Sequence, residues 1–409
     1  MKIEEPIYRF DKFDKNWLFV KISDIAGQFK TGGTPSTKEQ IFWDGTIPWI
    51  QSSDLQKDIL FGIKPQKFIS EKGLQNSSAK LIPKNSIAIV TRVGVGKLAI
   101  IDQDYATSQD FLSLSDFGED IQFIVYSIYR MLQKESTQLQ GTSIKGITKE
   151  DLLSKKIALP EIEEQQAIGS LFRTIDDLLA SYKDNLANYQ SLKATMLTKM
   201  FPKAGQSVPE IRLDEFEGEW EVQTIKELAS FSKGNGYTKN DLVNSGKEII
   251  LYGRLYTNYQ TVISQVNTFV TKVKANAVIS KGGEVIVPAS GESAEDISRA
   301  SVVEKSGVIL GGDLNIIYPD ENKVDSIFLA LTISNGSQQK ELIKRAQGKS
   351  VVHLRNSDLE KVILHYPSME EQRAIGSYFS NLDNLINSYQ EKISQLETLK
   401  KKLLQDMFI

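Results

Sequence analysis

One long segment occurs twice in this chain, and the repeat constrains the fold more than any other feature. Residues 160–202 align without a gap on residues 367–409, at a shift of 207, and roughly 18 of the 43 positions are identical. An internal repeat sets the architecture of a protein before any local pattern does. Whatever structure this segment forms, the molecule is therefore expected to contain it twice.

Each copy is predicted to be a long helix. Both start with a proline and an acidic first turn, Glu163 and Glu164 or Glu370 and Glu371, which suits the positive end of a helix dipole. Apolar residues then recur in steps of three and four, averaging 3.5 residues over about five heptads, which predicts a coiled coil. The seam positions are Ile168, Phe172, Ile175, Leu179, Tyr182, Leu186, Tyr189, Met196 and Met200 in the first copy and Ile375, Phe379, Leu382, Ile386, Tyr389, Ile393, Leu396, Leu403 and Met407 in the second.

Several features favour pairing of the two helices with each other. A helix of about 36 residues rises about 54 Å, so it needs something long beside it. Lys193 and Lys400 interrupt the two seams at equivalent positions. Long connecting segments predict an antiparallel pair. The alternative, two ordinary core helices, is weakened by the matching register and the matching lysines.

Composition limits the class of protein. The 409 residues allow two or more domains, and 40% hydrophobic with 25% charged residues is typical of a soluble protein. Zero cysteines exclude disulfides and cysteine-based zinc sites, and only His353 and His365 remain for a metal or a histidine-dependent triad. No apolar run is long enough to span a membrane, so we expect a cytoplasmic location. A net charge of −3 argues against a simple polycationic nucleic-acid binder.

The segments before the two helices also resemble each other. Trp220 aligns with Trp17 near the start, and Gln347–Leu359 aligns with Gln140–Leu152 at the same shift of 207, whereas the loops differ. We predict an α+β protein with two mixed α/β domains, separated by two long helices in an antiparallel coiled coil with pseudo-twofold repetition. The predicted order is a first domain at 1–158, a first helix at 159–202, a linker at 203–209, a second domain at 210–366 and a second helix at 367–409.

Three groups of motifs stand out along the chain. They are Gly32-Gly-Thr-Pro-Ser-Thr37 with Trp43 and Ile47-Pro-Trp49, the pair Gln140–Ser143 and Gln347–Ser350, and the pair Pro160–Gly169 and Pro367–Gly376. On these motifs the chain resembles the specificity (S) subunits of type I restriction-modification systems, over essentially its whole length. The second domain departs from that pattern, since Lys233-Gly-Asn-Gly-Tyr-Thr238 stands where the first has its Gly-Thr-Pro-Ser loop.

The resemblance implies a subunit that recognises DNA without catalysing a reaction. Each domain would be a target-recognition domain that reads one half of a split, asymmetric site in double-stranded DNA, and the paired helices would set the spacing. Two methyltransferase (M) subunits would bring S-adenosylmethionine, and restriction/translocase (R) subunits would bring ATP and Mg. The chain itself would hold no cofactor.

Absent motifs agree with this expectation. Gly94-Val-Gly-Lys97 lacks the hydroxyl residue that follows the lysine of a phosphate-binding loop, and Ile343 stands where Gly348-Lys-Ser350 would need its first glycine. No Asn/Asp-Pro-Pro-Tyr/Phe tetrapeptide of an adenine methyltransferase is present. We expect no catalytic residues and no metal ligands.

Candidate DNA contacts are polar residues in the loops of both domains. Lys, Arg and loop N–H groups suit phosphates, and Arg, Lys, Asn, Gln, Ser and Thr suit base edges. The alternative for each candidate is an ordinary surface loop residue. The candidates are Thr34, Ser36, Thr37, Ser52, Ser53, Arg92, Lys97, Gln109 and Lys145 in the first domain and Lys233, Asn235, Tyr237, Arg254, Tyr256, Ser290, Arg299 and Lys349 in the second.

Two rival functions remain open at this level. A non-catalytic coiled-coil scaffold with two protein- or glycan-binding domains would show no salt-dependent DNA affinity, whereas a DNA reader would lose affinity steeply as salt rises. An enzyme with a fused nuclease or methylase is the weakest alternative, because its motifs are missing.

Overall fold

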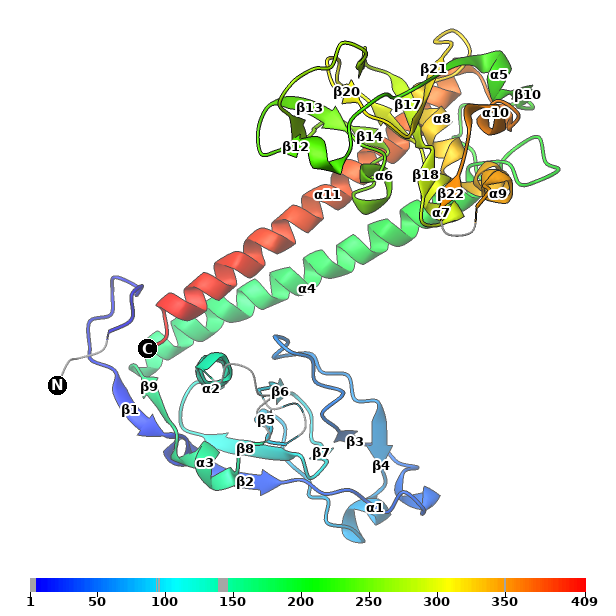
Figure 1. Ribbon diagram of the computed structural model, residues 1–409. Coiled ribbons are helices and arrows are strands. Elements are labelled where there is room, and N and C mark those ends of the chain that lie inside the picture. Colours follow the sequence, from blue (N-terminus) through cyan, green and yellow to red (C-terminus); the bar gives the residue numbers. More distant parts are fainter. Residues whose placement is uncertain (1–4, 93, 95, 139–145, 349–350) are drawn as a thin grey trace. The chain divides into compact units, whose positions relative to one another are not determined.

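The computed structural model describes residues 5–92, 94, 96–138, 146–348 and 351–409 (Figure 1). The chain divides into two compact units. Unit 1 consists of Met1–Asp184 and Glu391–Ile409, and unit 2 consists of Asn185–Gln390. The repeat predicts two long helices, and the structure has them as α4 (Ile162–Lys199) and α11 (Met369–Asp406). Each of them contributes residues to both units.

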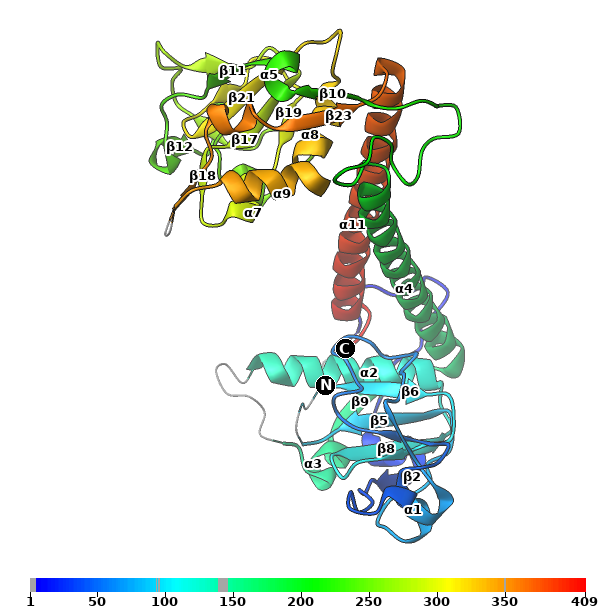
Figure 2. The same ribbon diagram turned by 90° about the vertical axis from the view of Figure 1, so that its right-hand side faces the viewer.

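Unit 1 is built on a four-stranded antiparallel sheet in the order β2-β8-β5-β6. The strands β5 and β6 form an antiparallel hairpin, in which Ile87 pairs with Ile100. All five residues of β5 are buried, and α2 covers one face of the sheet (Figure 2). The strands are β2 (Ala26–Thr31), β5 (Ser86–Val90), β6 (Leu98–Ile101) and β8 (Phe111–Phe117).

Two smaller sheets complete unit 1. One has the order β4-β3-β7, in which β3 runs parallel to β7, and the other pairs β1 with β9. The strands are β1 (Leu18–Lys21), β3 (Ile47–Ile50), β4 (Lys67–Ile69), β7 (Ala106–Thr107) and β9 (Lys156–Leu159). The helices are η1 (Ile22–Asp24), η2 (Gln40–Phe42), α1 (Glu71–Gln75), α2 (Ile121–Gln138) and α3 (Lys149–Ser154).

Unit 2 repeats this frame with additions. Its main sheet has the order β11-β21-β17-β19-β14, and its second sheet the order β12-β15-β13-β20-β16. The strands are β10 (Glu221–Thr224), β11 (Ala229–Lys233), β12 (Leu242–Val243), β13 (Lys247–Ile250), β14 (Val262–Ile263), β15 (Phe269–Val270), β16 (Val278–Ile279), β17 (Glu284–Pro288), β18 (Ser290–Gly291), β19 (Ser301–Val303), β20 (Ile309–Leu310), β21 (Leu314–Pro319), β22 (Val352–His353) and β23 (Ile363–Tyr366). The helices are α5 (Ile225–Leu228), η3 (Lys239–Asp241), α6 (Arg254–Thr257), α7 (Ala294–Ile297), α8 (Ser326–Ile333), α9 (Gly336–Arg345) and α10 (Asn356–Leu359).

The strand order confirms the predicted internal repeat. The series β11-β21-β17-β19 corresponds to β2-β8-β5-β6, and the parallel pair β13 and β20 corresponds to β3 and β7. Unit 2 replaces the single helix α2 by the two helices α8 and α9. The second of these starts at Gly336, whose φ of 66° lies in the left-handed region that favours glycine.

In each unit, an arginine that precedes the first strand binds the start of a long helix. Arg9 donates through Nε and Nη2 to the two carboxylate oxygens of Glu164, at 2.8 and 2.7 Å. Arg212 binds Glu371 in the same two-pronged way, at 2.7 Å for both bonds. Both glutamates are buried, so they are structural ion-pair partners and not merely first-turn residues that face the helix dipole.

The neighbouring glutamine connects each long helix to its own unit. The Gln165 amide donates to the Pro160 carbonyl at 2.9 Å and accepts from the Asp120 backbone N–H at 3.1 Å. Gln372 makes the two equivalent bonds at 2.9 Å each. These contacts explain why Pro, Glu and Gln recur at fixed spacing in both copies.

The two long helices pair antiparallel in both units. In unit 1, Asp176 of α4 pairs with Lys400 of α11, and in unit 2, Asp383 of α11 pairs with Lys193 of α4. The lysines that interrupt the predicted seams therefore form cross-helix ion pairs. Of the predicted seam, Ile168, Phe172, Ile175, Leu179, Met200, Ile375, Phe379, Leu382, Ile386, Ile393 and Met407 are buried, and Tyr182, Leu186, Tyr189, Met196, Tyr389, Leu396 and Leu403 are half-buried.

Candidate nucleic-acid interface

In unit 1, four loops meet at one end of the sheets. The Gly33 backbone N–H donates to the Thr107 carbonyl at 2.8 Å, which joins the loop after β2 to the end of β7. Thr34 donates from Oγ1 to Gln109 Oε1 at 2.5 Å. The loop after β3 is joined to the β5–β6 hairpin by Lys97, whose Nζ donates to the Ser52 carbonyl at 3.0 Å. Candidates from separate parts of the sequence are thereby brought together.

Close packing fixes the shape of the first of these loops. A Cβ added to Gly32 would lie 2.1 Å from the Ser108 carbonyl oxygen, so only glycine fits there. The Trp49 indole N–H donates to the Gly33 carbonyl at 2.9 Å. Trp43 packs edge-to-face on Trp49, with ring centroids 4.9 Å apart. The Gly-Thr-Pro-Ser loop therefore forms a closely packed platform against the end of β7.

This platform leaves polar groups at the surface of unit 1. Thr34, Ser52 and Lys97 are half-buried and already bonded within the unit, whereas the other described candidates are exposed. Lys145 lies outside the described residues. The exposed candidates of unit 1 are Ser36, Thr37, Ser53, Arg92 and Gln109.

In unit 2, the loop after β11 occupies the equivalent position. Lys233 and Asn235 are exposed, and Asn235 Nδ2 donates to the Asn276 carbonyl at 3.1 Å. Tyr237 is buried, and its hydroxyl accepts from the Lys274 backbone N–H at 2.6 Å. The Nζ of Lys274 lies 4.3 Å from the centre of the Tyr237 ring. Tyr237 therefore acts as the support of a loop that carries Lys274.

Arg254 also supports its surroundings instead of projecting from them. Its Nη1 donates to Asn267 Oδ1 at 3.1 Å, and its Nη2 donates to Gln260 Oε1 at 2.8 Å and to the Gln265 carbonyl at 2.9 Å. Burial lowers the pKa of Arg254 below its ordinary value. The half-buried Tyr256 lies in the same α6 helix, and burial raises the pKa of its hydroxyl, which stays a neutral donor.

The remaining candidates of unit 2 lie apart from these. Ser290 is buried in β18, where its hydroxyl donates to Asp313 Oδ2 at 3.1 Å. The guanidinium of the half-buried Arg299 lies 5.7 Å from the centre of the Tyr259 ring. Lys349 lies outside the described residues.

Sequence reasoning missed two exposed groups and a loop lysine at this end of unit 2. His353 in β22 pairs with Ser290 of β18, and Arg355 follows two residues later, and both are exposed. Their sequence signal was the Gln-Gly-x-Ser motif just before them. Lys274 could not be found in this way, because Tyr237, which positions it, lies 37 residues away in the chain.

Two kinds of feature are absent from the described part of the chain. Within it, no three His, Cys, Asp or Glu side chains are grouped so that they could hold a metal ion. None of its helices combines the length and the apolar character required to cross a bilayer.

Comparison with known proteins identifies the family. The model of the type I restriction modification DNA specificity domain matches twice, at residues 14–188 and 217–398. The type I restriction enzyme MjaIX specificity subunit of Methanocaldococcus jannaschii is 22% identical over 409 residues, which cover 96% of this chain and 93% of that protein. The EcoR124I/EcoR124II specificity subunit of Escherichia coli is 33% identical over 193 residues, 44% of this chain and 46% of its own.

A solved structure supports the fold independently. The crystal structure of a type I restriction-modification S subunit from M. genitalium superposes with a TM-score of 0.67 over 99% of both chains, at 16% identity. At that identity the likeness concerns the fold alone. Because the family model matches both halves and covers most of the sequence, this chain belongs to the family of type I restriction-modification DNA specificity proteins.

Proposed function

We propose that this chain is the sequence-reading subunit of a type I restriction-modification complex, and that each unit reads one half of a split DNA site. The observation that carries the proposal is the repeated strand frame, β2-β8-β5-β6 and β11-β21-β17-β19, with different loops at its ends. Two copies of one frame with unrelated loops suit two different half-sites. The scaffold alternative for proteins or glycans has no support from the family.

Within each unit, the exposed loop residues are the proposed contacts. Arg92 and Lys233 are exposed cations suited to phosphates or guanine edges, and Gln109 and Asn235 carry amides suited to adenine. Lys274 joins this set. The buried Tyr237 and Ser290 and the internally bonded Arg254 would act by positioning the loops.

The long helices provide the proposed ruler. A DNA reader of two half-sites about one turn apart requires a stiff connection, because a flexible linker would not fix a spacing of about 34–36 Å. The helices α4 and α11 have 38 residues each and pair antiparallel through both units. We infer that they set the spacer length between the half-sites.

The chemistry would come from partner subunits. Two methyltransferase (M) subunits would bring S-adenosylmethionine and methylate adenine in each half-site, and restriction/translocase (R) subunits would bring ATP and Mg. This chain would contribute no catalytic group, and a cytoplasmic location would give it access to the host DNA. The absence of methyltransferase and phosphate-loop motifs from its sequence supports this division of roles.

The experiment co-expresses the chain with the methyltransferase encoded beside it and maps N6-methyladenine in the host DNA. We expect one split motif, and exchange of Trp17–Lys155 for the same segment of another family member should change only one half of it. Lys233→Gln should weaken methylation through the other half. A complex that forms but methylates no adenine, or a swap that alters both halves, would contradict the proposal.

A further inference from the structure

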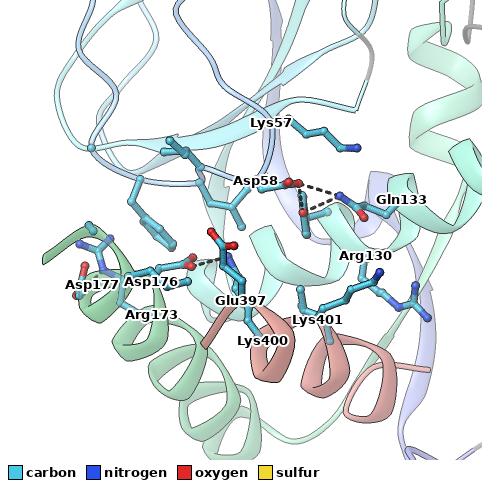
Figure 3. A pocket seen from close by; sticks show the side chains of 18 of the residues that line it. Lys57, Asp58, Arg130, Gln133, Arg173, Asp176, Asp177, Glu397, Lys400 and Lys401 are labelled. Carbon is cyan, nitrogen blue, oxygen red and sulfur yellow. Dashed lines mark hydrogen bonds and ion pairs between the residues drawn. The ribbon is translucent and has the colours of Figure 1, made fainter. Parts of the chain in front are cut away.

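Unit 1 contains a pocket of about 700 Å³ outside the loop cluster (Figure 3). Its walls come from the segment 57–62, from α2, and from the parts of α4 and α11 that belong to unit 1. A volume of this size is typical of sites for small organic ligands. The DNA-reading role described above does not use this pocket.

The acidic side chains of the pocket all have partners. Asp58 accepts from the Tyr129 hydroxyl and, at 3.0 Å, from Gln133 Nε2. Burial raises the pKa of Tyr129, and the bond to Asp58 raises it further, so the hydroxyl stays protonated and donates. The other acids are neutralised in the ion pairs Arg173–Asp177 (3.0 Å), Lys183–Glu397 (2.7 Å) and Lys400–Asp176.

Three cations of the pocket are left without a partner. Among the described residues, no side chain or carbonyl pairs with the charged groups of Lys57, Arg130 or Lys401. Figure 3 shows Arg130 and Lys401 extending toward the same side of the pocket. Like charges that line one pocket repel each other and raise the local concentration of anions. An anionic ligand would remove that repulsion.

The pocket also has an apolar wall. Leu60, Leu179 and Leu404 are buried side chains that line the pocket, and the ring of Phe61 lies under the Arg173 guanidinium at 4.1 Å.

The repeat indicates that the positive charge of Lys401 is not part of the helix pairing that both units share. Lys400 has the counterpart Lys193 in the first long helix, and both form cross-helix ion pairs. Lys401, one residue later, has Ala194 as its counterpart. Lys401 is therefore not required by the helix pairing that both units share.

We propose that this pocket binds a phosphate-bearing ligand, with the phosphate between Arg130, Lys401 and Lys57 and the less polar part against Phe61 and Leu404. Two sources supply that chemistry: a free mononucleotide, or a backbone phosphate of DNA. The apolar wall favours the nucleotide, because a sugar-phosphate backbone alone would leave that wall uncovered. Binding of a free nucleotide is independent of the proposed DNA-reading role, whereas binding of a DNA backbone phosphate rests on that role.

The first arm of the test measures binding of AMP, adenosine and inorganic phosphate to the full chain by calorimetry. AMP should bind more tightly than either part alone. The double variant Arg130→Gln/Lys401→Gln should lower the affinity for AMP by about tenfold or more, since it removes two charge-assisted contacts. Lys57→Gln should lower that affinity less. Lys402→Gln is the matched control, because Lys402 is an exposed neighbour on α11 that does not line the pocket.

The second arm measures the affinity of the same proteins for DNA as a function of salt. If the phosphate belongs to DNA, the double variant should reduce the slope of log K against log salt by about 0.9 for each lost contact, and AMP should not bind. If AMP binds and the slope is unchanged, the source is the free nucleotide. Absence of AMP binding together with an unchanged slope would overturn the proposal, and the methylated motif of the host DNA would still test the DNA-reading role separately.

Discussion

Replacing Arg9 by methionine tests the ion pair that holds the start of α4. Glu164 is fully buried and accepts two bonds from Arg9, whereas the Arg9 side chain is 17% exposed. Losing one partner of a buried pair costs about 3–5 kcal/mol, because the other charge stays buried and alone. Because water can reach the pair from the side of Arg9, we expect Arg9→Met to lower the free energy of unfolding by about 3 kcal/mol, the lower end of this range.

Two further variants separate the net value of the pair from the cost of breaking it. Glu164→Gln keeps the shape of the side chain and leaves the partly exposed Arg9 to solvent, so it should cost less, about 1–2 kcal/mol. The double variant Arg9→Met/Glu164→Leu removes both charges and should lie within about 1 kcal/mol of the wild type. Arg212→Met should reproduce the effect in unit 2, where Glu371 is equally buried.

The assay is urea unfolding followed by tryptophan fluorescence. A Trp220→Phe background removes the one tryptophan of unit 2, so that the signal comes from unit 1 alone. Arg212→Met is measured with Trp220 retained, because Trp220 reports on unit 2. Lys15→Met is the matched control, since Lys15 is largely exposed and pairs with Glu161 at the surface, where ion pairs contribute little. Equal midpoints for Arg9→Met and Lys15→Met, or a double variant as unstable as Arg9→Met, would refute the reasoning.

Three other perturbations have defined outcomes. Lys400→Met leaves Asp176 half-buried without its cation and should lower the stability of unit 1 by about 2–3 kcal/mol in the same assay. Gly32→Ala forces a Cβ against backbone and should cost about 2 kcal/mol by urea unfolding, whereas Gly118→Ala, with open space around it, should cost far less. Burial lowers the pKa of His365 below its unfolded value of about 6.5, so its stabilisation is present above that pH and is lost as pH falls through the folded pKa; His365→Gln should flatten this part of a stability-against-pH curve.

Local patterns predicted the elements well where one physical signal dominated. The run Ser86–Val90 is apolar after its first residue, which is typical of a buried strand, and the structure pairs it with Leu98–Ile101. The helix starts at residues 162 and 369 follow the predicted proline and acidic turn. The local pattern could not predict that Arg9 pairs with Glu164, because Arg9 lies 155 residues earlier in the chain.

The candidate interface was predictable as a set of loops but not residue by residue. Lys97 and Gln109 are both polar loop residues, and both are bonded within unit 1, yet Lys97 is half-buried and Gln109 is exposed. Tyr237 is a candidate DNA contact by sequence, and the structure buries it. Loop side chains face solvent or the interior according to contacts with distant strands, and those contacts leave no periodic signal.

The sequence by itself determined the duplicated architecture and the two long helices, because these depend on repetition and on apolar spacing along the chain. Its motifs resemble those of the specificity subunits, and the match of the family model to both halves shows the membership. Only the tertiary structure decided which loop residues are available, that Lys193 and Lys400 are cross-helix partners, and that Lys57, Arg130 and Lys401 line one pocket. The physical reason is that charge pairing and burial depend on which distant segments fold against each other.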